Sequence, residues 1–555
     1  MNFTFANNWL LGVAITVSVV NAILLLVISY KLIHIFQLGG YKLRPFINWL
    51  ADLRIGFYVR LFALSVLSFG SIFIVNVIFD RWDDLIFISY VALVFYFIFS
   101  LVFCHNILRK KEKIKLRYTA RVKRLFILLF AVFALMTYTI LWVGHEPIGG
   151  FVRFSFIALI PVLLPPLLII TNLLMWPIEA SIRQYYINKA KRKLFSKEFD
   201  NTIRIGITGS YAKTSCKNIL GTMLSKKYKT VISPSSYNTP MGYARTINDV
   251  LKSGDEVIIF EMGLRYKRNI KQLARLFKPQ HGILTGIGNQ HIETMKTQEA
   301  IIAEKSELVK ALPKDGIAVL NGESEGCVTI HNNLFLEGKI LINVDTDNII
   351  VQGIPSPYRA EKISVTKDGC EFDLILNTEH VRCKTILLGK HNIENILMCA
   401  TMAHKLGVGA EQIAVAISEL QPTPHRLQLI KGASGVIVLD DSYNASDQGT
   451  KAALDVLALF NGKKIVQTPG IIEQGKNQGQ TNFKYARNIA NVADEVIIIN
   501  EVNREALVEG LKSQNFPIEK IHLVRNLDGA KELYSKLLSS GDVLLIANDL
   551  PDNFV

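Results

Sequence analysis

The first 180 residues contain long apolar runs, whereas the later residues alternate short apolar runs with longer mixed ones. A helix that crosses a membrane needs about 20 consecutive apolar residues. Five runs of that kind contain no charged residue, and we expect each to span a membrane: Trp9–Ser29, Leu61–Phe79, Leu85–Cys104, Leu125–Gly144 and Phe154–Trp176. So many runs in one block exclude a wholly soluble protein. The first run also lacks the basic start and the cleavage site of a signal peptide.

The basic residues between these runs predict an orientation, because Lys and Arg accumulate on cytoplasmic loops. The connection after the third run, residues 109–124, holds nine of them, and the segments after the first and fifth runs are also basic. The other two connections, around 80–84 and 145–153, are acidic or nearly neutral. We therefore expect a multi-pass protein of a bacterial cytoplasmic (inner) membrane, with its N-terminus outside and everything after Trp176 in the cytoplasm.

The end of this block carries two further local signals. Pro161, Pro165 and Pro166 predict a kink in the fifth span. Residues 179–200 are basic and have helical spacing, with Ile182, Tyr186 and Ala190 on one face. This membrane-proximal linker helix either lies along the inner surface against anionic lipid headgroups or is a solvated connector.

The positive net charge belongs to the apolar block. Residues 1–200 hold 22 Lys and Arg against 9 Asp and Glu, and the remaining residues are nearly balanced, with 40 against 38. The charge therefore does not indicate a nucleic-acid partner. The six cysteines form no CxxC pair, which argues against a zinc ribbon or a disulfide framework and fits a reducing compartment.

Past residue 200 the sequence predicts a phosphate-binding loop. A β-rich run, Thr202–Thr208, is followed by residues 209–215 (GSYAKTS) and then by a helical stretch from Cys216 to Leu224. Strand, tight loop and helix is the context in which backbone N–H groups wrap phosphates. The expected phosphate ligands in the loop are Gly209, Ser210, Lys213, Thr214 and Ser215. The match to GxxxxGK[ST] is incomplete, because Ile207 and Ala212 stand at the two glycine positions.

Further motifs follow in a fixed order, and together they resemble the Mur ligase family. They are IIFEMG (258–263), TGIGNQH (285–291), IAEKSE (302–307), VLN (319–321), GKHNIEN (389–395), PHR (424–426) and LDDSYN (439–444). The loop itself reads TGSxxKTS, as in that family, and DDSYN is most similar to the MurF type. The resemblance covers about residues 201–555, and only the ordered set is specific.

The resemblance implies an enzyme that uses ATP and two Mg²⁺ ions to join an amine to a carboxylate. Lys213 and Thr214 would hold the β- and γ-phosphates and the first Mg²⁺. Glu261 would bind the same ion and His291 a second one. Lys305 matches the family's carbamylated lysine, an anionic ligand. Taken alone, Glu261 is also typical of a solvated loop acid, His291 of a satisfied polar residue and Lys305 of a solvent-facing member of an ion pair.

The resemblance also implies the remaining contacts to the nucleotide. Asn321 would meet the adenine, and Asn395 would lie at the nucleotide and metal region. Arg426 and Asp441 would come from the last domain and close over ATP. Catalysis would then rest on Lys213 and Asp441 together with the metal-binding residues above.

Three local departures from the family pattern stand out. Ala212 replaces a loop glycine; its Cβ either crowds the phosphates or is tolerated if φ is negative. Residues 467–475 read QTPGIIEQG where MurF-type enzymes have GDMxELG, and Ser446-Asp447 replaces Asn-Pro. The apolar spans also stand where the soluble enzymes carry a UDP-binding domain.

We therefore predict a multi-domain fold: a transmembrane bundle of about five helices (1–178), the linker (179–200), a central P-loop α/β domain (201–420) and a doubly wound α/β domain (421–555). The expected activity is ATP-dependent amide ligation at the inner membrane face. The expected partners are ATP, membrane lipids, a carboxylate acceptor on a lipid-linked or cell-wall precursor, and an amino-acid or peptide amine. Two alternatives stay open: a poly-γ-glutamate-type polymer synthase, and a catalytically degenerate membrane scaffold.

Overall fold

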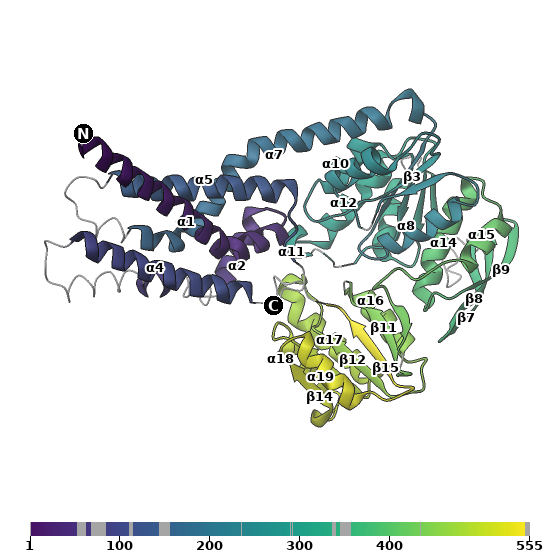
Figure 1. Cartoon of the computed structure of the whole chain (residues 1–555). Coiled ribbons are helices and arrows are strands. Elements are labelled where there is room, and N and C mark those ends of the chain that lie inside the picture. Colours follow the sequence, from purple (N-terminus) through teal and green to yellow (C-terminus); the bar gives the residue numbers. More distant parts are fainter. Residues whose placement is uncertain are drawn as a thin grey trace. The chain divides into compact units, whose positions relative to one another are not determined.

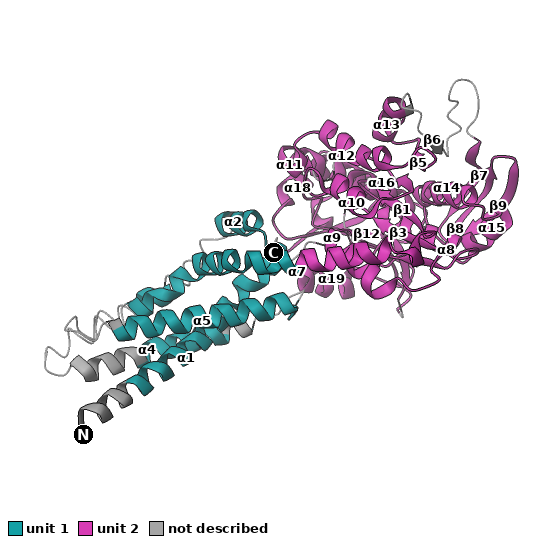
Figure 2. Cartoon of the chain, turned by 90° about the horizontal axis from the view of Figure 1, so that it is seen from above, with its two compact units in different colours: residues 1–182, 551–555 teal, residues 183–550 magenta. Residues whose placement is uncertain are grey.

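The computed structural model describes residues 2–52, 63–67, 85–109, 115–143, 156–234, 236–288, 290, 292–335, 340–344, 357–432, 434–443 and 445–549. These residues fall into two compact units, residues 1–182 and residues 183–550 (Figure 2). The first unit is helical and the second contains three β-sheets.

The first unit is built from apolar helices that pack on one another (Figure 1). Its elements are α1 (Asn2–Leu38), α2 (Leu43–Asp52), α4 (Leu85–Leu108), α5 (Ala120–Val143), the 3₁₀ turn η2 (Ile160–Leu163) and the start of α7 (Leu164–Leu194). Asn21 of α1 donates to the Thr137 hydroxyl at 2.9 Å and accepts from the Tyr96 hydroxyl at 2.9 Å. All three side chains are buried, so hydrogen bonds between polar groups connect α1, α4 and α5 inside an apolar bundle.

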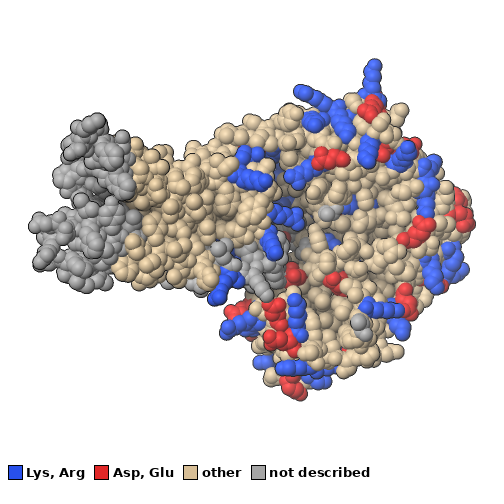
Figure 3. All heavy atoms as spheres, viewed as in Figure 1, with Lys and Arg blue, Asp and Glu red and all other residues tan. Residues whose placement is uncertain are grey.

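The outer surface of this bundle is also apolar. Large hydrophobic side chains such as Leu101, Ile127, Leu135 and Trp176 are more than half exposed. Over most of the length of the described helices, the face drawn in Figure 3 shows almost only uncharged side chains. Among the described residues, three helices are long and apolar enough to cross a membrane: Leu11–Leu38, Ala120–Trp142 and Phe156–Leu194.

Four of the five expected spans coincide with helices of the described residues. The first, fourth and fifth spans coincide with the three long apolar helices, and the third coincides with α4, of which Val94–His105 forms a shorter apolar stretch. Most of the second span lies outside the described residues. A total of five membrane spans therefore stays a prediction.

The linker helix is continuous with the fifth span. The 3₁₀ turn η2 contains Pro161, and Pro165 and Pro166 fall in the first turn of α7, where a missing backbone N–H costs nothing. α7 then continues past Pro177 to Leu194. Of the face expected for the linker, Ala190 is buried in the core of the second unit together with Ile187 and Leu194, whereas Tyr186 is exposed, so the prediction was wrong for Tyr186.

The second unit begins with a six-stranded parallel sheet of order β2-β3-β1-β4-β5-β6. Its strands are β1 (Ile203–Thr208), β2 (Thr230–Ile232), β3 (Val257–Glu261), β4 (His281–Leu284), β5 (Ile317–Asn321) and β6 (Ile340–Val344). β3 is buried at every position, as expected for a central strand whose two faces are covered by helices. Because the strands are parallel, their carboxyl ends meet at one edge, and Thr208, Glu261 and Asn321 lie there.

Helices cover both faces of this sheet (Figure 1). They are α8 (Lys213–Leu224), α9 (Pro240–Arg245), the π-helical turn η4 (Thr246–Val250), α10 (Asn269–Phe277), α11 (Ile292–Met295), α12 (Gln298–Ala311), α13 (Glu325–Phe335), α14 (Lys390–Lys405) and α15 (Ala410–Ser418). An antiparallel sheet of β7 (Tyr358–Thr366), β8 (Gly369–Leu376) and β9 (Glu379–Thr385) packs into the same core as α8, α14 and α15. The 3₁₀ turn η3 (Lys197–Phe199) precedes β1.

The last part of the unit has its own sheet, of order β10-β11-β15-β12-β13-β14. Its strands are β10 (Gln428–Lys431), β11 (Ile437–Asp441), β12 (Lys464–Thr468), β13 (Glu495–Ile499), β14 (Ile521–Val524) and β15 (Val543–Ala547); only β10 is antiparallel to its neighbour. The intervening helices are α16 (Asp447–Leu457), η5 (Gly475–Asn477), α17 (Gln478–Ala490), α18 (Arg504–Lys512), η6 (Ile518–Lys520) and α19 (Leu527–Leu537). The predicted alternation of strands and helices is confirmed here.

Candidate active site

The segment between β1 and α8 forms a tight loop at the carboxyl edge of the central sheet. The Ser210 amide donates to the Gly286 carbonyl at 2.8 Å, and the Ser210 hydroxyl exchanges hydrogen bonds with the Gly288 backbone at 2.9 and 3.0 Å. A Cβ at Gly209 would collide with the Thr285 hydroxyl, so this position requires glycine. Two loops from neighbouring strands are thereby held against each other.

Ala212 adopts the left-handed conformation, with φ of 59°. Ala212 stands where the family has a glycine, and this replacement would be harmless at a negative φ. The φ of Ala212 is positive. An L-residue in this region costs roughly 1–2 kcal/mol. Ala212 is also the N-cap of α8, and its side chain accepts no hydrogen bond. The first N–H groups of α8 therefore have no side-chain cap, a usual feature of helix ends that receive anions.

Lys213 lies at the first position of α8 with its amine folded back onto the loop. Its Nζ donates to the Gly209 carbonyl at 2.8 Å and approaches the Ser210 carbonyl at 3.5 Å. Burial lowers the pKa of Lys213 to about 8; Glu261 opposes that shift and Arg426 adds to it. The amine is therefore an incompletely balanced cation that an additional negative charge would stabilise.

Glu261, at the end of β3, connects the loop to the neighbouring strand. Its Oε2 accepts from the Thr214 hydroxyl at 2.9 Å, and its Oε1 accepts from the Asn238 amide at 3.5 Å. The side chain is only 2% exposed. A carboxylate beside a helix-start hydroxyl, at the mouth of a phosphate loop, is the donor set that Mg²⁺ prefers when phosphates complete its shell.

Lys305 reaches the loop from α12 and is completely buried. Its Nζ donates to the Ser210 hydroxyl at 2.8 Å. Burial and the neighbouring Lys213 hold the pKa of Lys305 well below its ordinary value. A neutral amine is nucleophilic, so this side chain can react with CO₂ in a way that an ammonium group cannot.

Arg426 and Asp441 face the loop from the last domain. Both side chains are largely withdrawn from water, and burial raises the pKa of Asp441 to about 7 although Arg426 lowers it. The Arg426 guanidinium lies 4.2 Å from the centre of the Tyr443 ring, and the Tyr443 hydroxyl donates to Ser236 at 2.9 Å. The electrostatic influence of Arg426 on Lys213, and of Glu261 on Arg426, shows that the two domains form one charge cluster.

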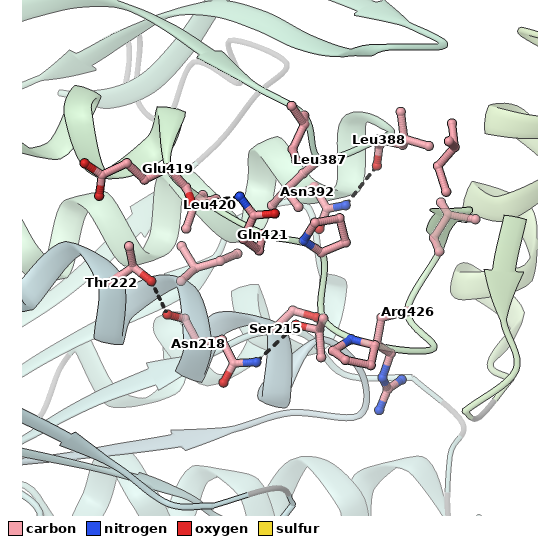
Figure 4. Close-up of a pocket in the computed structure, with 17 residues that line it drawn as sticks. Ser215, Asn218, Thr222, Leu387, Leu388, Asn392, Glu419, Leu420, Gln421 and Arg426 are labelled. Carbon is pink, nitrogen blue, oxygen red and sulfur yellow. Dashed lines mark hydrogen bonds between the residues drawn. The ribbon is translucent and has the colours of Figure 1, made fainter. Parts of the chain in front are cut away.

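A cavity of about 260 Å³ opens beside this cluster, between α8, the start of α14 and residues 419–429 (Figure 4). Ser215, Asn218 and Thr222 line it from one face of α8, and Asn392 and Arg426 line it from the other side. The Asn218 amide donates to the Thr423 hydroxyl at 3.1 Å, so the floor of the cavity is tied to the connection between the domains. A polar group at each wall and an apolar rim are typical of small-molecule sites.

Asn321 and Asn395, two further residues predicted to contact the nucleotide, do not line this cavity. The Asn321 amide donates to the Thr285 carbonyl at 3.2 Å. Asn395 is buried behind the loop, where its side-chain oxygen accepts from the Cys216 thiol at 3.5 Å and its amide donates to Asn392 at 3.4 Å. The structure therefore brings together the predicted residues Lys213, Thr214, Glu261, Lys305, Arg426 and Asp441. His291, and with it the predicted second metal site, lies outside the described residues.

Sequence reasoning missed a group of residues on the far side of the loop. The Tyr211 ring fills the space that a Cβ at Gly286 would need. It neighbours Ser324, Glu323 and Glu394, which all act on its pKa. Burial and the adjacent Glu323 hold the pKa of Glu394 well above its ordinary value. Tyr211, Gly286 and Glu394 lie within the quoted motifs, but nothing in those motifs indicates this contact, because it joins segments 75 or more residues apart.

Taken together, these features define an α/β protein with a phosphate loop whose charged groups come from two domains. Residues 207–403 match the family profile for the Mur ligase middle domain, and residues 425–548 match that for the Mur ligase, glutamate ligase domain. A UDP-N-acetylmuramoyl-tripeptide–D-alanyl-D-alanine ligase of Mycobacterium leprae is 30% identical over 370 residues, which is 62% of this chain and 70% of the relative. The chain belongs to the Mur ligase family.

Other relatives match over shorter segments. The enzyme of the same description from Bacillus subtilis is 28% identical over 275 residues, so the match spans 49% of this chain and 56% of that protein's length. Among solved structures, MurF from Acinetobacter baumannii superimposes with a TM-score of 0.58 at 21% identity, over 66% of this chain and 77% of that one. MurF of Thermotoga maritima in complex with ADP gives 0.56 at 20% identity, over 66% and 80%. At these identities the structural likeness establishes the fold.

Proposed function

We propose that this protein is a membrane-anchored, ATP-dependent amide ligase. It activates a carboxylate as an acyl phosphate and couples it to the amine of an amino acid or peptide. The observation that carries the proposal is the convergence of Lys213, Glu261, Lys305, Arg426 and Asp441, which lie in separate motifs of the sequence, in one buried charge cluster. Both the middle-domain and the C-terminal-domain profiles of the Mur ligase family support it.

The residues present fit a nucleoside triphosphate with Mg²⁺. The loop offers uncapped N–H groups at the start of α8 and the Lys213 amine, and the neighbouring cavity is of a size to take part of a nucleoside. Thr214 and Glu261 would hold Mg²⁺ at the mouth of the loop, since hydroxyl and carboxylate oxygens suit this hard cation. When bound, ATP supplies the phosphoryl group that activates the carboxylate, and Mg²⁺ neutralises charge on the transferring oxygens.

Side chains of the protein would then position the reactants and stabilise their negative charge. Lys213 and Arg426, one from each domain, would place positive charge beside the phosphates. Such fixed cations stabilise the charge that develops during transfer without having to reorganise. Asp441 balances Arg426 when the site is empty of anions, and it orients the Leu427 backbone by accepting from its amide at 3.1 Å. Contact between the two domains across this cluster also excludes water.

Lys305 fits the role of a carbamylated lysine. Its neutral amine can add CO₂ and become an anion, which Lys213 nearby would stabilise. The resulting carbamate oxygens would lie within reach of the Ser210 hydroxyl and could complete the ligands of a second Mg²⁺ together with His291. The role of Asn321 at the adenine and of Asn395 at the nucleotide and metal region belongs to the same proposal.

The apolar helices suggest where the acceptor is presented. Three helices of membrane-spanning length precede the ATP-binding fold in the same chain, and the last of them continues directly into it. We infer a multi-pass protein of the bacterial inner membrane with the ligase domains in the cytoplasm. The acceptor is then a carboxylate on a lipid-linked or cell-wall precursor at the inner face of the membrane.

ATP turnover by the purified, detergent-solubilised full chain tests the enzymatic part of the proposal. We expect Mg²⁺-dependent turnover in the wild type and its loss in Lys213→Ala, because the variant removes the cation that meets the phosphates. Equal turnover in the two proteins would contradict the proposal and favour the degenerate scaffold.

Analysis of cells that lack the protein tests the substrate. A ligase of this kind consumes a carboxylate, so its loss should cause a carboxylate-bearing lipid or cell-wall intermediate to accumulate. Mass spectrometry of the lipid extract and of the soluble nucleotide-sugar pool would identify it. Accumulation in the soluble pool alone would contradict the lipid-linked acceptor, and a missing long polymer would favour the polymer synthase.

A further inference from the structure

The helix that contains α7 is about twice as long as a membrane crossing requires. It runs over 39 residues, Phe156–Leu194, whereas about 20 residues cross the hydrocarbon core. Its second half, residues 177–194, therefore continues beyond the hydrocarbon of the proposed membrane and enters the second unit (Figure 1). No function so far described uses the surface of this half.

One face of this half is committed to the second unit. Ile187, Ala190 and Leu194 are buried in the hydrophobic core of that unit. The Lys193 amine donates to the Leu251 carbonyl at 2.6 Å. These contacts fix the rotation of the helix about its own axis, and they thereby fix which residues point away from the second unit.

The opposite face is exposed and basic. At about 100° per residue, it consists of Tyr185, Asn188, Lys189 and Arg192, which line an open hollow of about 230 Å³. We call these four residues the outer face. Residues 183–194 contain five basic residues and no acidic one. Within the part of the chain that the structure describes, neither Lys189 nor Arg192 makes an ion pair, so both charges are available to a partner.

The outer face continues an exposed stripe that begins in the membrane span. Leu174 and Ile178 lie on the same side of α7, at helical spacing from Tyr185, and they are 61% and 57% exposed. Tyr185, which is 64% exposed, comes next, and Lys189 and Arg192 follow. Apolar, aromatic and then basic is the order in which side chains meet the hydrocarbon, the headgroups and the anionic surface of a cytoplasmic leaflet.

We propose that the outer face binds the anionic phospholipid headgroups of the inner leaflet. This inference rests on the membrane location in the proposed function, which it deepens by giving the ligase unit a lipid partner. Lys189 and Arg192 contact the lipid phosphates, and Tyr185 lies at the level of the headgroups. The face is open and belongs to one helix, so it suits an extended charged surface better than a small free anion.

The contact requires the second half of α7 to incline toward the bilayer. If the helix continued along the membrane normal, Lys189 would lie about 20 Å beyond Trp176, further than the Debye length of about 8 Å at physiological salt. Pro177 is the place for such a bend, because its missing N–H already leaves one helical hydrogen bond unmade. Removing the two cations should therefore increase the distance between the outer face and the headgroups.

Fluorescence quenching of the full chain in lipid nanodiscs tests this proposal. The six native cysteines are buried, so the variant Asn188→Cys can be labelled with bimane at the outer face alone. One set of discs contains phosphatidylcholine, and the other contains phosphatidylcholine mixed with phosphatidylglycerol. Both sets contain the same fraction of a lipid that carries a nitroxide quencher on its headgroup.

The labelled protein is compared with three double variants made in the same background. Lys189→Gln with Arg192→Gln removes the two charges, and Lys189→Arg with Arg192→Lys keeps them. Lys512→Gln with Lys520→Gln is the matched control, because it removes two exposed lysines of the last domain. ATP turnover in the same discs verifies that each variant is folded, since all these residues lie outside the charge cluster.

We expect quenching to be about twofold or more stronger in the anionic discs than in the neutral ones. Removing two cations should lower the equilibrium constant for contact roughly 25-fold and so abolish this difference. The charge-keeping variant and the control should retain it. The difference should also disappear when the ionic strength rises from about 0.1 to 1 M, because the Debye length falls from about 10 to 3 Å.

Three results would overturn the proposal: equal quenching in both sets of discs, an undiminished difference in the charge-removing variant, or loss of the difference when pyrophosphate is added at constant ionic strength. The last result would show that the outer face takes a free phosphate ligand in place of lipid headgroups. Failure of the wild type to enter the discs or to turn over ATP would instead contradict the proposed function. The two kinds of failure are therefore distinguishable in the same preparation.

Discussion

The two edges of the central sheet both carry basic side chains, but they hold them in opposite ways. At the amino edge, an open groove of about 830 Å³ is lined by five basic residues, three of which are already engaged. Lys271 pairs with Glu307 at 2.9 Å, Arg204 donates to the Lys278 carbonyl at 3.0 Å, and the Lys278 amine lies 5.6 Å from the centre of the Phe195 ring. These groups satisfy one another at the surface.

At the carboxyl edge, Lys213 is half-buried and Lys305 is buried, and among the described residues their amines donate to neutral acceptors. Burial lowers the pKa of both amines, and the charge of Lys213 lowers the pKa of Lys305 further. The number of basic residues therefore does not distinguish a binding site from a solvated surface. Desolvation that nearby counter-charges do not fully offset does, because such a group gains free energy when an anion or a reaction partner arrives.

The largest effect should come from exchanging a buried lysine at the carboxyl edge. Lys305→Met should reduce ATP turnover at least a hundredfold, since methionine fills the same space but cannot be carbamylated or bind metal. Its thermal stability should rise, because a buried polar amine is removed. Lys310→Met, on the same helix but at the amino edge, is the control and should leave both measurements unchanged. Wild-type turnover in Lys305→Met would remove Lys305 from the mechanism.

The next effect concerns the carboxylate contributed by the last domain. Asp441→Asn should lower turnover roughly ten- to a hundredfold, because Arg426 loses the carboxylate that most favours its charge. Asp441 has a pKa raised to about 7, so the pH profile of the wild type should show an acidic limb near that pH that the variant lacks. Asp440→Asn, whose carboxylate bonds to His425 and Ser442, should keep the limb. A limb that persists in Asp441→Asn would contradict the assignment.

A smaller, pH-dependent effect is expected at Glu394. Its pKa in the folded protein is raised above 4.5, so the folded state holds a proton that the unfolded state has already lost. Stability should therefore fall as the pH rises from about 5 to 8. Glu394→Gln should flatten this decline, as measured by urea unfolding at several pH values. An unchanged slope of stability against pH would show that Glu394 and Glu323 do not repel each other in a shared buried site.

The smallest effect is expected at the strained loop residue. Ala212→Gly should stabilise the second unit by up to about 1 kcal/mol, because glycine adopts a positive φ without strain. It should also strengthen ATP binding slightly, since the loop then needs less restraint from Tyr211 and Thr285. Thermal unfolding and nucleotide titration measure the two effects. A destabilised variant would mean that the Ala212 methyl group makes contacts that outweigh its strain.

Local sequence patterns were sufficient to predict the strand, loop and helix around Lys213, the α/β character of the last domain and the apolar helices. Each depends on periodicity within one segment. The membership of the charge cluster followed from the family resemblance, and the structure brings Thr214, Glu261 and Asp441 together accordingly. The positive φ of Ala212 could not be read from the chain, because the surrounding loop contacts impose it.

Contacts between distant segments also remained beyond sequence reasoning. Nothing near Tyr211 indicates that its ring lies against Gly286 and beside Glu394. The continuation of α7 past Pro177 was equally hidden, because a proline removes one hydrogen bond but tertiary packing of Ile187, Ala190 and Leu194 retains the helix. These features depend on what the folded chain places next to each residue.

Titration with ATP and Mg²⁺ tests most directly whether the carboxyl edge of the central sheet binds the nucleotide. The proteins to compare are the full-length wild type, Lys213→Ala and Lys271→Ala. We expect Lys213→Ala, at the carboxyl edge, to weaken binding about a hundredfold and Lys271→Ala, at the amino edge, to have no effect. Equal affinities in all three proteins, or a loss confined to Lys271→Ala, would contradict this expectation.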